Sequence, residues 1–572
     1  MSGEDHHDPA VHEEAVARAN TYLRTFVPDA EESLRTDRRA VLTGIGTTAA
    51  GSALFSGIAG ADGGGGAGSD DSHASTVGGF AGEPRGVHAS FTEDPTSTVT
   101  LTWFTDGRRD PGTVVEFGNG GDVDDRTTGR AAELPFVEAL VHRATITELE
   151  PGATVTYRVG GDSGFSDTHT VTIDDGSRFF SMTFTGDQGV TDSGLATRDR
   201  ALALDPDLHL VIGDVSYADG DSPVWDLYFG QQESLLATTP TMNQVGNHEF
   251  KDGADAADYK ARHSHPDSGE IAERHCYSFR YGNVHFSGVD NSGSVLSNGR
   301  LQDVLRWIEH DLATARLARA RGEIQYIVVF MHHPIYTNQA KRSTNPLYQV
   351  LLEPALHRHD VDLVLVGHDH IYERSFPMAY GVPTTTVRSP YTTHRVGFVH
   401  LQNGVGGQSL RRVRPEHQRS RWSAAAADDA YAVSQMNVVE TYGLDIRTVT
   451  ADEGRLVDEF FMNPQYYEEP IEGLPTDVAT EVDAVEAAVV DAGQQLQEFA
   501  AAAGRDASYF ESFEPTAFRE VPGFEDLARR LMTIGDAHPA RVFRAAAIDP
   551  EGVDIPEGLI APRRELLAEL LP

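Results

Sequence analysis

Five short polar clusters, each placed directly after an apolar run, contain the residues of this chain whose types could carry out chemistry. Aspartate, asparagine, histidine and tyrosine recur in them, and cysteine does not. Carboxylate and phenolate oxygens are hard ligands that suit Fe(III), whereas imidazole nitrogens and an amide oxygen suit a divalent ion. The clusters are Gly186-Asp187-Gln188-Gly189, Gly213-Asp214-Val215-Ser216-Tyr217, Gly246-Asn247-His248-Glu249, Met331-His332-His333-Pro334 and Gly367-His368-Asp369-His370.

The clusters together indicate a metal-dependent hydrolase more strongly than any one of them alone. Taken singly, a Gly-Asp pair is typical of a turn, Asn247 of a cap and Tyr217 of a core position, because short motifs match by chance. A carboxylate can bridge two ions, and two metals ~3.5–4 Å apart are a common device for phosphoryl displacement. The joint occurrence of these ligand types therefore predicts a two-metal site for phosphate chemistry.

Apolar strands must position these side chains. From Phe179 to about Met462, apolar strands alternate with helical stretches, which predicts a layered α/β domain. In an open α/β sheet the loops that follow the strands gather along the carboxyl edge, and glycine permits close backbone approach there. We therefore expect the five clusters to meet at one place, after strands at 180–184, 209–212, 241–245, 326–330 and 361–366.

The rest of the chain divides into segments of different composition. Short alternating strands such as Val99–Trp103 and Val155–Val159 predict a β-sandwich before the α/β domain. The tail is rich in alanine and glutamate, has helical periodicity and shows no chemistry. We expect a leader with an export signal at 1–61, a flexible linker at 62–84, a β-sandwich at 85–175, the catalytic domain at 176–462 and an acidic helical extension at 463–572.

The leader carries the features of a twin-arginine signal. Asp37-Arg38-Arg39 precedes a mild apolar run from Gly44 to Gly60, and Ala59-Gly60-Ala61 fits a cleavage site for a signal peptidase. The run is too short for a membrane helix of ~20 strongly apolar residues. The sequence thus predicts a secreted protein, exported by the twin-arginine pathway, with no stable membrane insertion after the signal is removed.

The chain is strongly acidic, with 46 basic and 87 acidic side chains and a formal charge of −41. Its lysines are Lys251, Lys260 and Lys341 alone. Such a charge repels nucleic-acid phosphates and anionic membranes, which argues against nucleic-acid binding. The acidity is spread along the chain, which favours adaptation to high salt, where the Debye length falls to roughly 3 Å. Cys276 is the single cysteine, so no intrachain disulfide can form.

With its clusters in this order, the chain resembles the purple acid phosphatases, a branch of the calcineurin-like metallophosphoesterases. Tyr217 separates that branch from most other metallophosphoesterases. The resemblance covers roughly 85–462 and includes a fibronectin-type amino-terminal domain, to which Val141-His142-Arg143 and Leu149-Glu150-Pro151-Gly152 are similar. It implies an α/β fold in which a β-sandwich precedes a layered αββα catalytic domain.

The resemblance also implies a ligand set for two metal ions. The expected Fe(III) ion takes Asp187, Asp214, Tyr217 and His370. The divalent ion (Zn, Mn or Fe) takes Asp214, Asn247, His332 and His368, so that Asp214 bridges the two. A hydroxide held by the metals is expected to attack phosphorus in line, with His248 hydrogen-bonded to the phosphoryl group.

One stretch departs from the family pattern. Plant-type relatives carry histidines a few residues after the His-x-Pro segment, one of which serves as general acid, whereas this chain has Lys341 and Arg342 there. Arginine is a poor general acid but a good phosphate clamp, so Arg342 is a candidate substrate-binding residue. Among the nearby imidazoles His248 is the better candidate acid, and His333 is expected to point away from the site.

Three functions are compatible with these residues. The leading interpretation is a phosphomonoesterase that acts on small phosphorylated substrates. A phosphodiesterase or nucleotide pyrophosphatase would use the same site. A non-catalytic secreted binding protein is the third, although the intact set of ligands argues against it.

Overall fold

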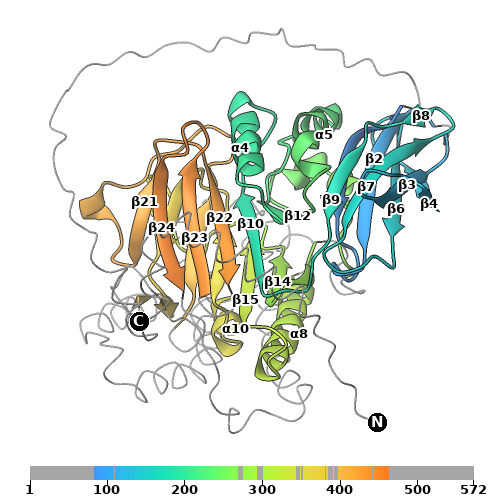
Figure 1. The fold of residues 1–572 in the computed structure, drawn as a ribbon. Helices are drawn as coiled ribbons and strands as arrows, with labels where there is room; N and C mark the ends of the chain where they lie inside the picture. Colours follow the sequence, from blue (N-terminus) through green and yellow to red (C-terminus); the bar gives the residue numbers. More distant parts are fainter. Residues whose placement is uncertain are drawn as a thin grey trace, which may run out of the picture. The chain divides into compact units, whose positions relative to one another are not determined.

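The computed structural model describes residues 83–462 except 109, 268–274, 293–300, 343–347, 350–351, 380–381, 384–390, 392–396 and 440–442. The expected leader, nearly all of the expected linker and the expected helical extension lie outside these residues. Figure 1 shows the described part as a strand-rich molecule with few helices. None of the described helices is long and apolar enough to cross a bilayer.

The amino-terminal domain consists of two antiparallel sheets. One has the order β1 (Arg85–Ser90), β2 (Val99–Asp106), β6 (Ala139–Ile146) and β5 (Arg130–Glu133). The other has the order β4 (Asp125–Thr128), β3 (Val114–Asn119), β7 (Thr154–Gly161) and β8 (Gly164–Phe165), and β9 (His169–Thr172) also pairs with β7. Trp103, Val115 and Tyr157, from both sheets, share one buried cluster. A β-sandwich results, as the alternating strands predict.

The following domain contains two larger mixed sheets. The six-stranded sheet has the order β12 (Thr241–Gln244), β11 (Leu208–Ile212), β10 (Phe179–Thr185), β22 (Ala432–Val439), β23 (Gly443–Thr450) and β24 (Leu456–Met462). The seven-stranded sheet has the order β13 (Tyr277–Tyr281), β14 (Val284–Val289), β15 (Tyr326–Met331), β16 (Leu363–Val366), β20 (Val399–Asn403), β17 (Tyr372–Ser375) and β21 (Ser423–Ala427). β10, β11 and β12 run parallel in the first sheet, and β14, β15, β16 and β20 run parallel in the second. A small hairpin, β18 (Met378–Ala379) and β19 (Val382–Pro383), stands apart.

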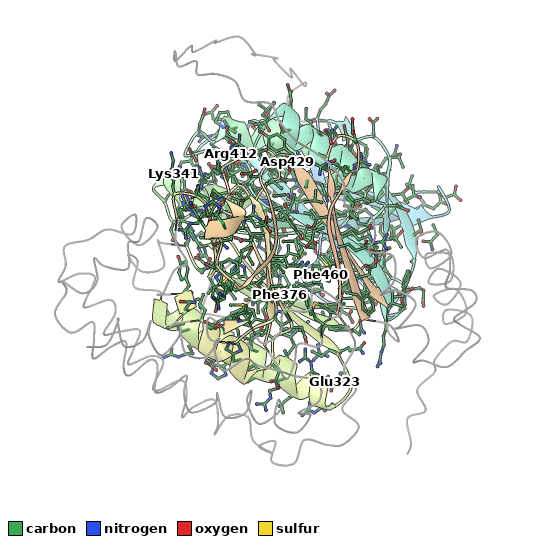
Figure 2. The ribbon with its side chains drawn as sticks, turned by 90° about the vertical axis from the view of Figure 1, so that its left-hand side faces the viewer. Glu323, Lys341, Phe376, Arg412, Asp429 and Phe460 are labelled. Atoms are coloured by element: carbon green, nitrogen blue, oxygen red, sulfur yellow. The ribbon has the colours of Figure 1, made fainter. Side chains whose placement is uncertain are left out.

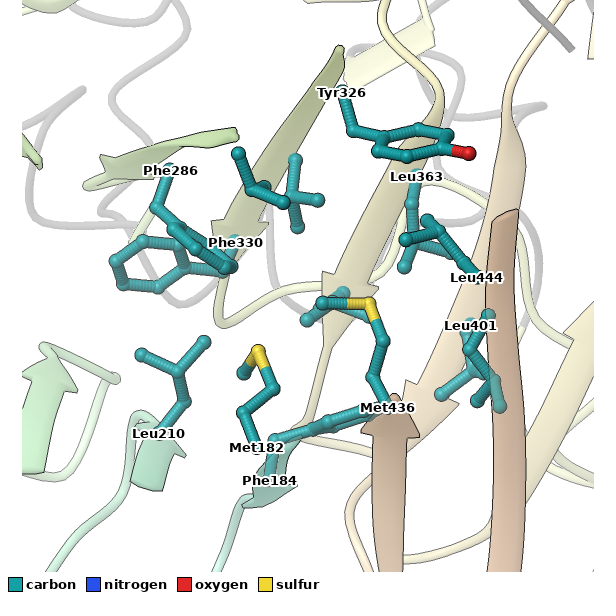
Figure 3. Close-up of a cluster of buried hydrophobic side chains, with 14 of the residues drawn as sticks. Met182, Phe184, Leu210, Phe286, Tyr326, Phe330, Leu363, Leu401, Met436 and Leu444 are labelled. Carbon is teal, nitrogen blue, oxygen red and sulfur yellow. The ribbon is translucent and has the colours of Figure 1, made fainter. Parts of the chain in front are cut away.

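The two sheets pack face to face across an apolar core, part of which Figure 3 shows. Met182, Leu210 and Met436 come from the six-stranded sheet, and Phe330 and Leu401 come from the seven-stranded sheet. Since side chains alternate along a strand, the next residue of each strand faces a helix layer instead. The sheets are therefore buried on both faces, which explains why their strands are continuous apolar runs.

Helices cover the outer faces. α4 (Asp192–Ala203) and α5 (Pro223–Leu236) lie against the six-stranded sheet, where Val211 and Val433 turn away from the inter-sheet core. α8 (Leu301–Ala320) and α10 (Glu353–Arg358) cover the seven-stranded sheet, and α8 buries Leu305, Ile308 and Leu312 on one face. The remaining helical turns are η2 (Glu249–Asp252), α6 (Ala257–Arg262) and η3 (Glu416–Gln418). These layers confirm the predicted αββα architecture.

The five polar clusters follow β10, β11, β12, β15 and β16. The expectation of a single sheet edge is too simple, because three of these strands belong to one sheet and two to the other. The clusters meet nevertheless, since the facing sheets bring their carboxyl ends together. His332, after β15, donates from Nδ1 to the carbonyl oxygen of Ile212 at the end of β11.

Candidate metal centre

Five of the seven expected ligands lie in left-handed backbone at the strand ends. The φ angles are 60° for Asp187, 51° for Asp214, 55° for Tyr217, 74° for His368 and 46° for His370. This conformation costs free energy for residues with a Cβ, and it persists only where the surroundings enforce it. The turns therefore direct these five side chains at the expense of local backbone stability, as is common at functional sites.

Asp187, Tyr217 and His370 form a first group of ligand atoms. The Tyr217 hydroxyl lies 2.9 Å from Asp187 Oδ1 and 3.0 Å from His370 Nε2. The same Nε2 lies 3.3 Å from Asp187 Oδ1. His370 Nδ1 is held by the carbonyl oxygen of Ser409 at 2.8 Å, which leaves Nε2 directed at the group. Two oxygens and one nitrogen thus converge within contact distance.

Asp214, His332 and His368 form a second group. His332 Nε2 lies 3.1 Å from Asp214 Oδ2 and 3.3 Å from His368 Nδ1. One ligand atom from each residue lies within 4.8 Å of the other two, and all three residues are buried. The groups adjoin, because the backbone N–H of His368 donates to Asp187 Oδ2 at 2.7 Å.

The polar atoms without partners fit a metal site. Asn247 Oδ1 and His368 Nε2 are buried without a hydrogen-bond partner among the described residues. Such orphaned atoms are costly, and a metal ion would remove that cost for Asn247 by accepting a lone pair of Oδ1. His368 faces the second group with Nδ1 rather than Nε2. Asn247 follows β12, as expected. The donor set of both groups, carboxylate, phenol, imidazole and amide, suits iron with a second borderline ion.

The buried carboxylates of the two groups shift the pKa values of His332 and Tyr217. Burial alone would lower the pKa of His332, but the Asp214 carboxylate outweighs burial and raises that pKa to about 10. Burial and the nearby Asp187 and Asp214 carboxylates hold the pKa of Tyr217 well above its usual range. A phenolate at Tyr217 therefore requires a strong cation beside it.

Glu249 and two glycines hold the Asp214 loop in place. The Glu249 carboxylate accepts the backbone N–H groups of Asp214, Val215 and Gly246 at 3.0, 2.8 and 2.6 Å. A Cβ on Gly246 would lie 2.2 Å from Asp214 Oδ1, and one on Gly213 would lie 2.5 Å from His332 Nδ1. The glycines in these clusters thus permit the close approach of two loops.

His248 lies at the open side of the centre. Its ring is 18% exposed, and its Nε2 lies 3.7 Å from Asp214 Oδ2. Asp219 Oδ1 lies 2.5 Å from Nδ1 of the ring and fixes its orientation, and Lys251 Nζ lies 3.3 Å from Asp219 Oδ2. The His248 ring also packs on Tyr217 with centroids 4.1 Å apart. Lys251 Nζ also lies 2.9 Å from Nδ1 and 3.2 Å from Nε2 of this ring, so Nε2 has a cationic neighbour near the expected ligand atoms.

The expectation for His333 is wrong. Its ring does not point away from the site but lies 4.1 Å, centroid to centroid, from the ring of His368. Hydrogen bonds of its backbone N–H and carbonyl to the Asn291 side chain, at 3.0 and 2.8 Å, turn the chain so that consecutive histidines both face inward. Burial is the main cause that lowers the pKa of His333 well below its usual value, so the ring is neutral.

Arg342 lies beside the ligand loop. Its Nη1 donates to Asp369 Oδ1 at 3.0 Å, and Asp369 stands between the ligands His368 and His370 in sequence. Lys341 is exposed on the same segment. The histidine-free segment after His-x-Pro therefore delivers a guanidinium to the neighbourhood of the centre.

Sequence reasoning misses several residues that the structure adds. Glu249 belongs to a quoted cluster, but nothing in the pattern shows that it binds three N–H groups. Asp219 follows Tyr217 by two positions, which is a usable signal for a partner of His248. Arg411 donates from Nη1 to the carbonyl oxygen of His368 at 2.9 Å. Its signal is the concentration of arginines at 411–414 in a chain dominated by acidic residues.

Comparisons with known proteins agree with this geometry. Residues 84–173 match the family described as Purple acid Phosphatase, N-terminal domain, and residues 164–372 match Calcineurin-like phosphoesterase. Purple acid phosphatase 21 of Arabidopsis thaliana is 30% identical over 307 residues, covering 52% of this chain and 67% of that protein. Acid phosphatase type 7 of Mus musculus is 29% identical over 419 residues, covering 66% of this chain and 90% of the relative.

A solved structure shares the fold. The purple acid phosphatase PPD1 from seeds of yellow lupin (Lupinus luteus) aligns with a TM-score of 0.60 at 20% identity. The alignment covers 69% of this chain and 77% of the lupin chain. At this identity the likeness supports the arrangement of domains and sheets.

Proposed function

Because this chain belongs to the purple acid phosphatases, a metallophosphoesterase family that hydrolyses phosphoric esters, we propose that it is a phosphomonoesterase with a two-metal centre. One observation carries the proposal. Six side chains of the required types converge in two adjoining groups, and the Oδ1 atom of Asn247, which follows β12, is buried without a partner among the described residues. A purely structural role would leave that oxygen unsatisfied.

The ligands divide between two ions. Asp187, Tyr217 and His370 would hold Fe(III), and Asn247, His332 and His368 would hold a divalent ion, Zn, Mn or Fe. Asp214 would contact both, as the family resemblance implies, and its Oδ2 lies 3.1 Å from His332 Nε2. When bound, two such ions supply a nucleophile from water at neutral pH and neutralise the charge of the phosphoryl oxygens.

The residues of the chain have separate tasks in this account. Asp219 holds His248 Nδ1 and orients the ring, and Lys251 Nζ lies 3.2 Å from Nε2, so His248 and Lys251 together would offer donors to a phosphoryl oxygen. Glu249 keeps the Asp214 loop rigid through three N–H groups. Fixed donors and ligands of this kind stabilise charge without reorganisation during the reaction.

We also propose that the protein is exported and acts in an environment of high salt. The twin-arginine pattern at residues 37–61 supports export, and the charge of −41 supports a working environment of high salt. We expect small external phosphate esters as substrates, with no nucleic-acid partner and no stable membrane insertion after the signal is removed.

The decisive experiment compares p-nitrophenyl phosphate with bis-p-nitrophenyl phosphate in high salt. We expect kcat/KM for the monoester to exceed that for the diester, and a chelator to abolish both activities. A higher kcat/KM for the diester would identify a phosphodiesterase. Hydrolysis of neither ester by metal-loaded protein would favour the non-catalytic alternative.

A further inference from the structure

Two arginines share one buried carboxylate next to the expected ligands. Arg342 Nη1 lies 3.0 Å and Arg411 Nη1 lies 3.9 Å from Asp369 Oδ1. The Asp369 side chain is 0% exposed, whereas the side chains of Arg342 and Arg411 are 28% and 31% exposed. We call Arg342 and Arg411 the guanidinium pair. Its formal charge exceeds that of the carboxylate by one, so the site remains cationic.

The guanidinium pair is fixed to the ligand loop. The backbone N–H of Arg411 donates to the carbonyl oxygen of His370 at 3.1 Å, and its Nη1 donates to the carbonyl oxygen of His368 at 2.9 Å. Arg342 reaches the same loop through Asp369, which stands between His368 and His370 in sequence. Both arginines thus belong to the surroundings of the centre.

Two chain segments hold the guanidinium pair together. Ala340 N–H donates to the carbonyl oxygen of Arg412 at 2.7 Å, and Gln339 pairs with Val413 in an antiparallel bridge. Arg414 donates to the carbonyl oxygen of Arg342 at 2.6 Å. Figure 2 shows Lys341 and Arg412, from the two segments, at the same end of the domain, while Glu323 lies at the opposite end. The segments would not have to be tied together for metal binding alone.

Most N–H donors of the guanidinium pair remain unclaimed. A guanidinium carries five N–H groups. Among the described residues, Asp369 accepts one from Arg342, and the His368 carbonyl accepts one from Arg411. The remaining donors of these half-buried side chains have no acceptor in that part of the chain. Arginine with free forked donors is well suited to bind phosphate oxygens.

We propose that the guanidinium pair binds a second phosphoryl group, the one bonded through oxygen to the phosphoryl group at the metal centre. This inference rests on the proposed phosphatase function and names its preferred substrates, which are terminal diphosphates. The metal ions would neutralise the transferred phosphoryl group, and the guanidinium pair would neutralise the group that leaves.

The reaction balances with water as the only co-reactant. Water oxygen forms a bond to the terminal phosphorus, and the bond from that phosphorus to the bridging oxygen breaks. The bridging oxygen departs with the second phosphoryl group and takes one proton of the water, and the other proton stays on the released phosphate. Inorganic pyrophosphate thus yields two hydrogen phosphate ions. Charge neutralisation by arginine at the departing oxygens replaces part of the need for a general acid.

The test measures kcat/KM for pyrophosphate, for ADP and for p-nitrophenyl phosphate with the metal-loaded full chain in high salt. The variants are Arg342→Gln, Arg411→Gln and, as a matched control, Arg412→Gln. The Arg412 side chain is 81% exposed and lies 3.6 Å from Asp428 rather than on Asp369. Within each sample the ratio of pyrophosphate to p-nitrophenyl phosphate kcat/KM is independent of the folded fraction.

We expect this ratio to fall about tenfold or more in Arg342→Gln and Arg411→Gln, through a rise in KM for pyrophosphate, and to stay at the wild-type value in Arg412→Gln. A parallel fall for ADP would extend the site to nucleoside diphosphates, and a fall for pyrophosphate alone would restrict it to the inorganic ion. An unchanged ratio in both variants overturns the inference, as does a wild type that cleaves p-nitrophenyl phosphate but not pyrophosphate. A wild type that cleaves none of the three overturns the phosphatase function itself.

Discussion

Two buried histidine–aspartate pairs in the same domain have different surroundings. His332 Nε2 lies 3.1 Å from Asp214 Oδ2, and His285 Nε2 lies 2.9 Å from Asp311 Oδ2. The second pair joins β14 to α8, and Ser287 also donates to Asp311. None of its side-chain atoms is buried without a partner in the described part of the chain.

The first pair lies at strand ends instead. Asp214 has a φ angle of 51°, and the neighbouring His368 Nε2 lacks a partner. Both pairs use the same residue types at nearly the same distance. The backbone conformation therefore distinguishes the first pair, as is common at functional sites, from a pair that joins a strand to a helix.

The largest expected difference between the pairs appears when each aspartate is replaced by asparagine. Asp214→Asn should lose metal together with activity, by at least about 100-fold, because the residue is placed to contact both ions. Asp311→Asn should retain both and lose about 1–3 kcal/mol of unfolding free energy, since buried hydrogen bonds to a charged acceptor are weakened. Metal analysis, turnover and thermal unfolding of both variants check this. Near-normal metal and turnover in Asp214→Asn would refute the bridging role.

A visible absorption band provides a second test of the candidate metal centre. A phenolate on Fe(III) gives a visible charge-transfer band, so Tyr217→Phe should remove the band. We expect the unfolding temperature to change by only a few degrees, because among the described residues the Tyr217 hydroxyl has hydrogen-bond contacts with Asp187 and His370 alone. Absorption spectra of oxidised, metal-loaded protein measure the band. Its absence from the wild type would show that Tyr217 is not a ligand or that the first metal is not iron.

The sequence predicts only part of the difference between the two histidine–aspartate pairs. The layered fold and the meeting of the polar clusters follow from polar residues after apolar runs, because strand ends in facing sheets meet. The division of those residues between two ions is what the family resemblance implies. Asp311 and His285 carry no such signal, and their pairing depends on how α8 packs on β14. The inward turn of His333 depends on Asn291, which is distant in sequence. Contacts of this kind arise from tertiary packing, so local pattern does not reveal them.

Salt should raise the unfolding temperature by screening charges on the surface. It should not affect the two buried histidine–aspartate pairs. Self-repulsion from a charge of −41 destabilises the compact state until it is screened. The unfolding temperature should therefore rise by several degrees or more from low to molar KCl, in wild type and in Asp311→Asn alike. A flat or falling dependence would rule out adaptation to salt. A slope that differs between the two proteins would mean that Asp311 is not insulated from solvent.

Acid should produce the smallest of these effects at the pair of Asp311 and His285. Burial raises the pKa of Asp311, but His285 and hydroxyl donors outweigh burial and lower it below its ordinary value. A carboxylate with a lowered pKa stabilises the fold above its unfolded pKa, about 4, and this contribution is lost as pH falls through the folded value. The stability difference between wild type and Asp311→Asn should thus shrink below about pH 4. Denaturant unfolding from pH 6 to pH 3 measures it, and a constant difference would show that folding does not lower the pKa of Asp311.

The metal content of the purified protein tests the central claim most directly. Elemental analysis of the folded chain, reconstituted with iron and one divalent metal and freed of loosely bound ions, gives the number of ions per chain. We predict two per chain in the wild type, with hydrolysis of p-nitrophenyl phosphate rising in proportion to occupancy. A chain that holds no tightly bound metal, or that hydrolyses the ester equally well without metal, would contradict the two-metal account.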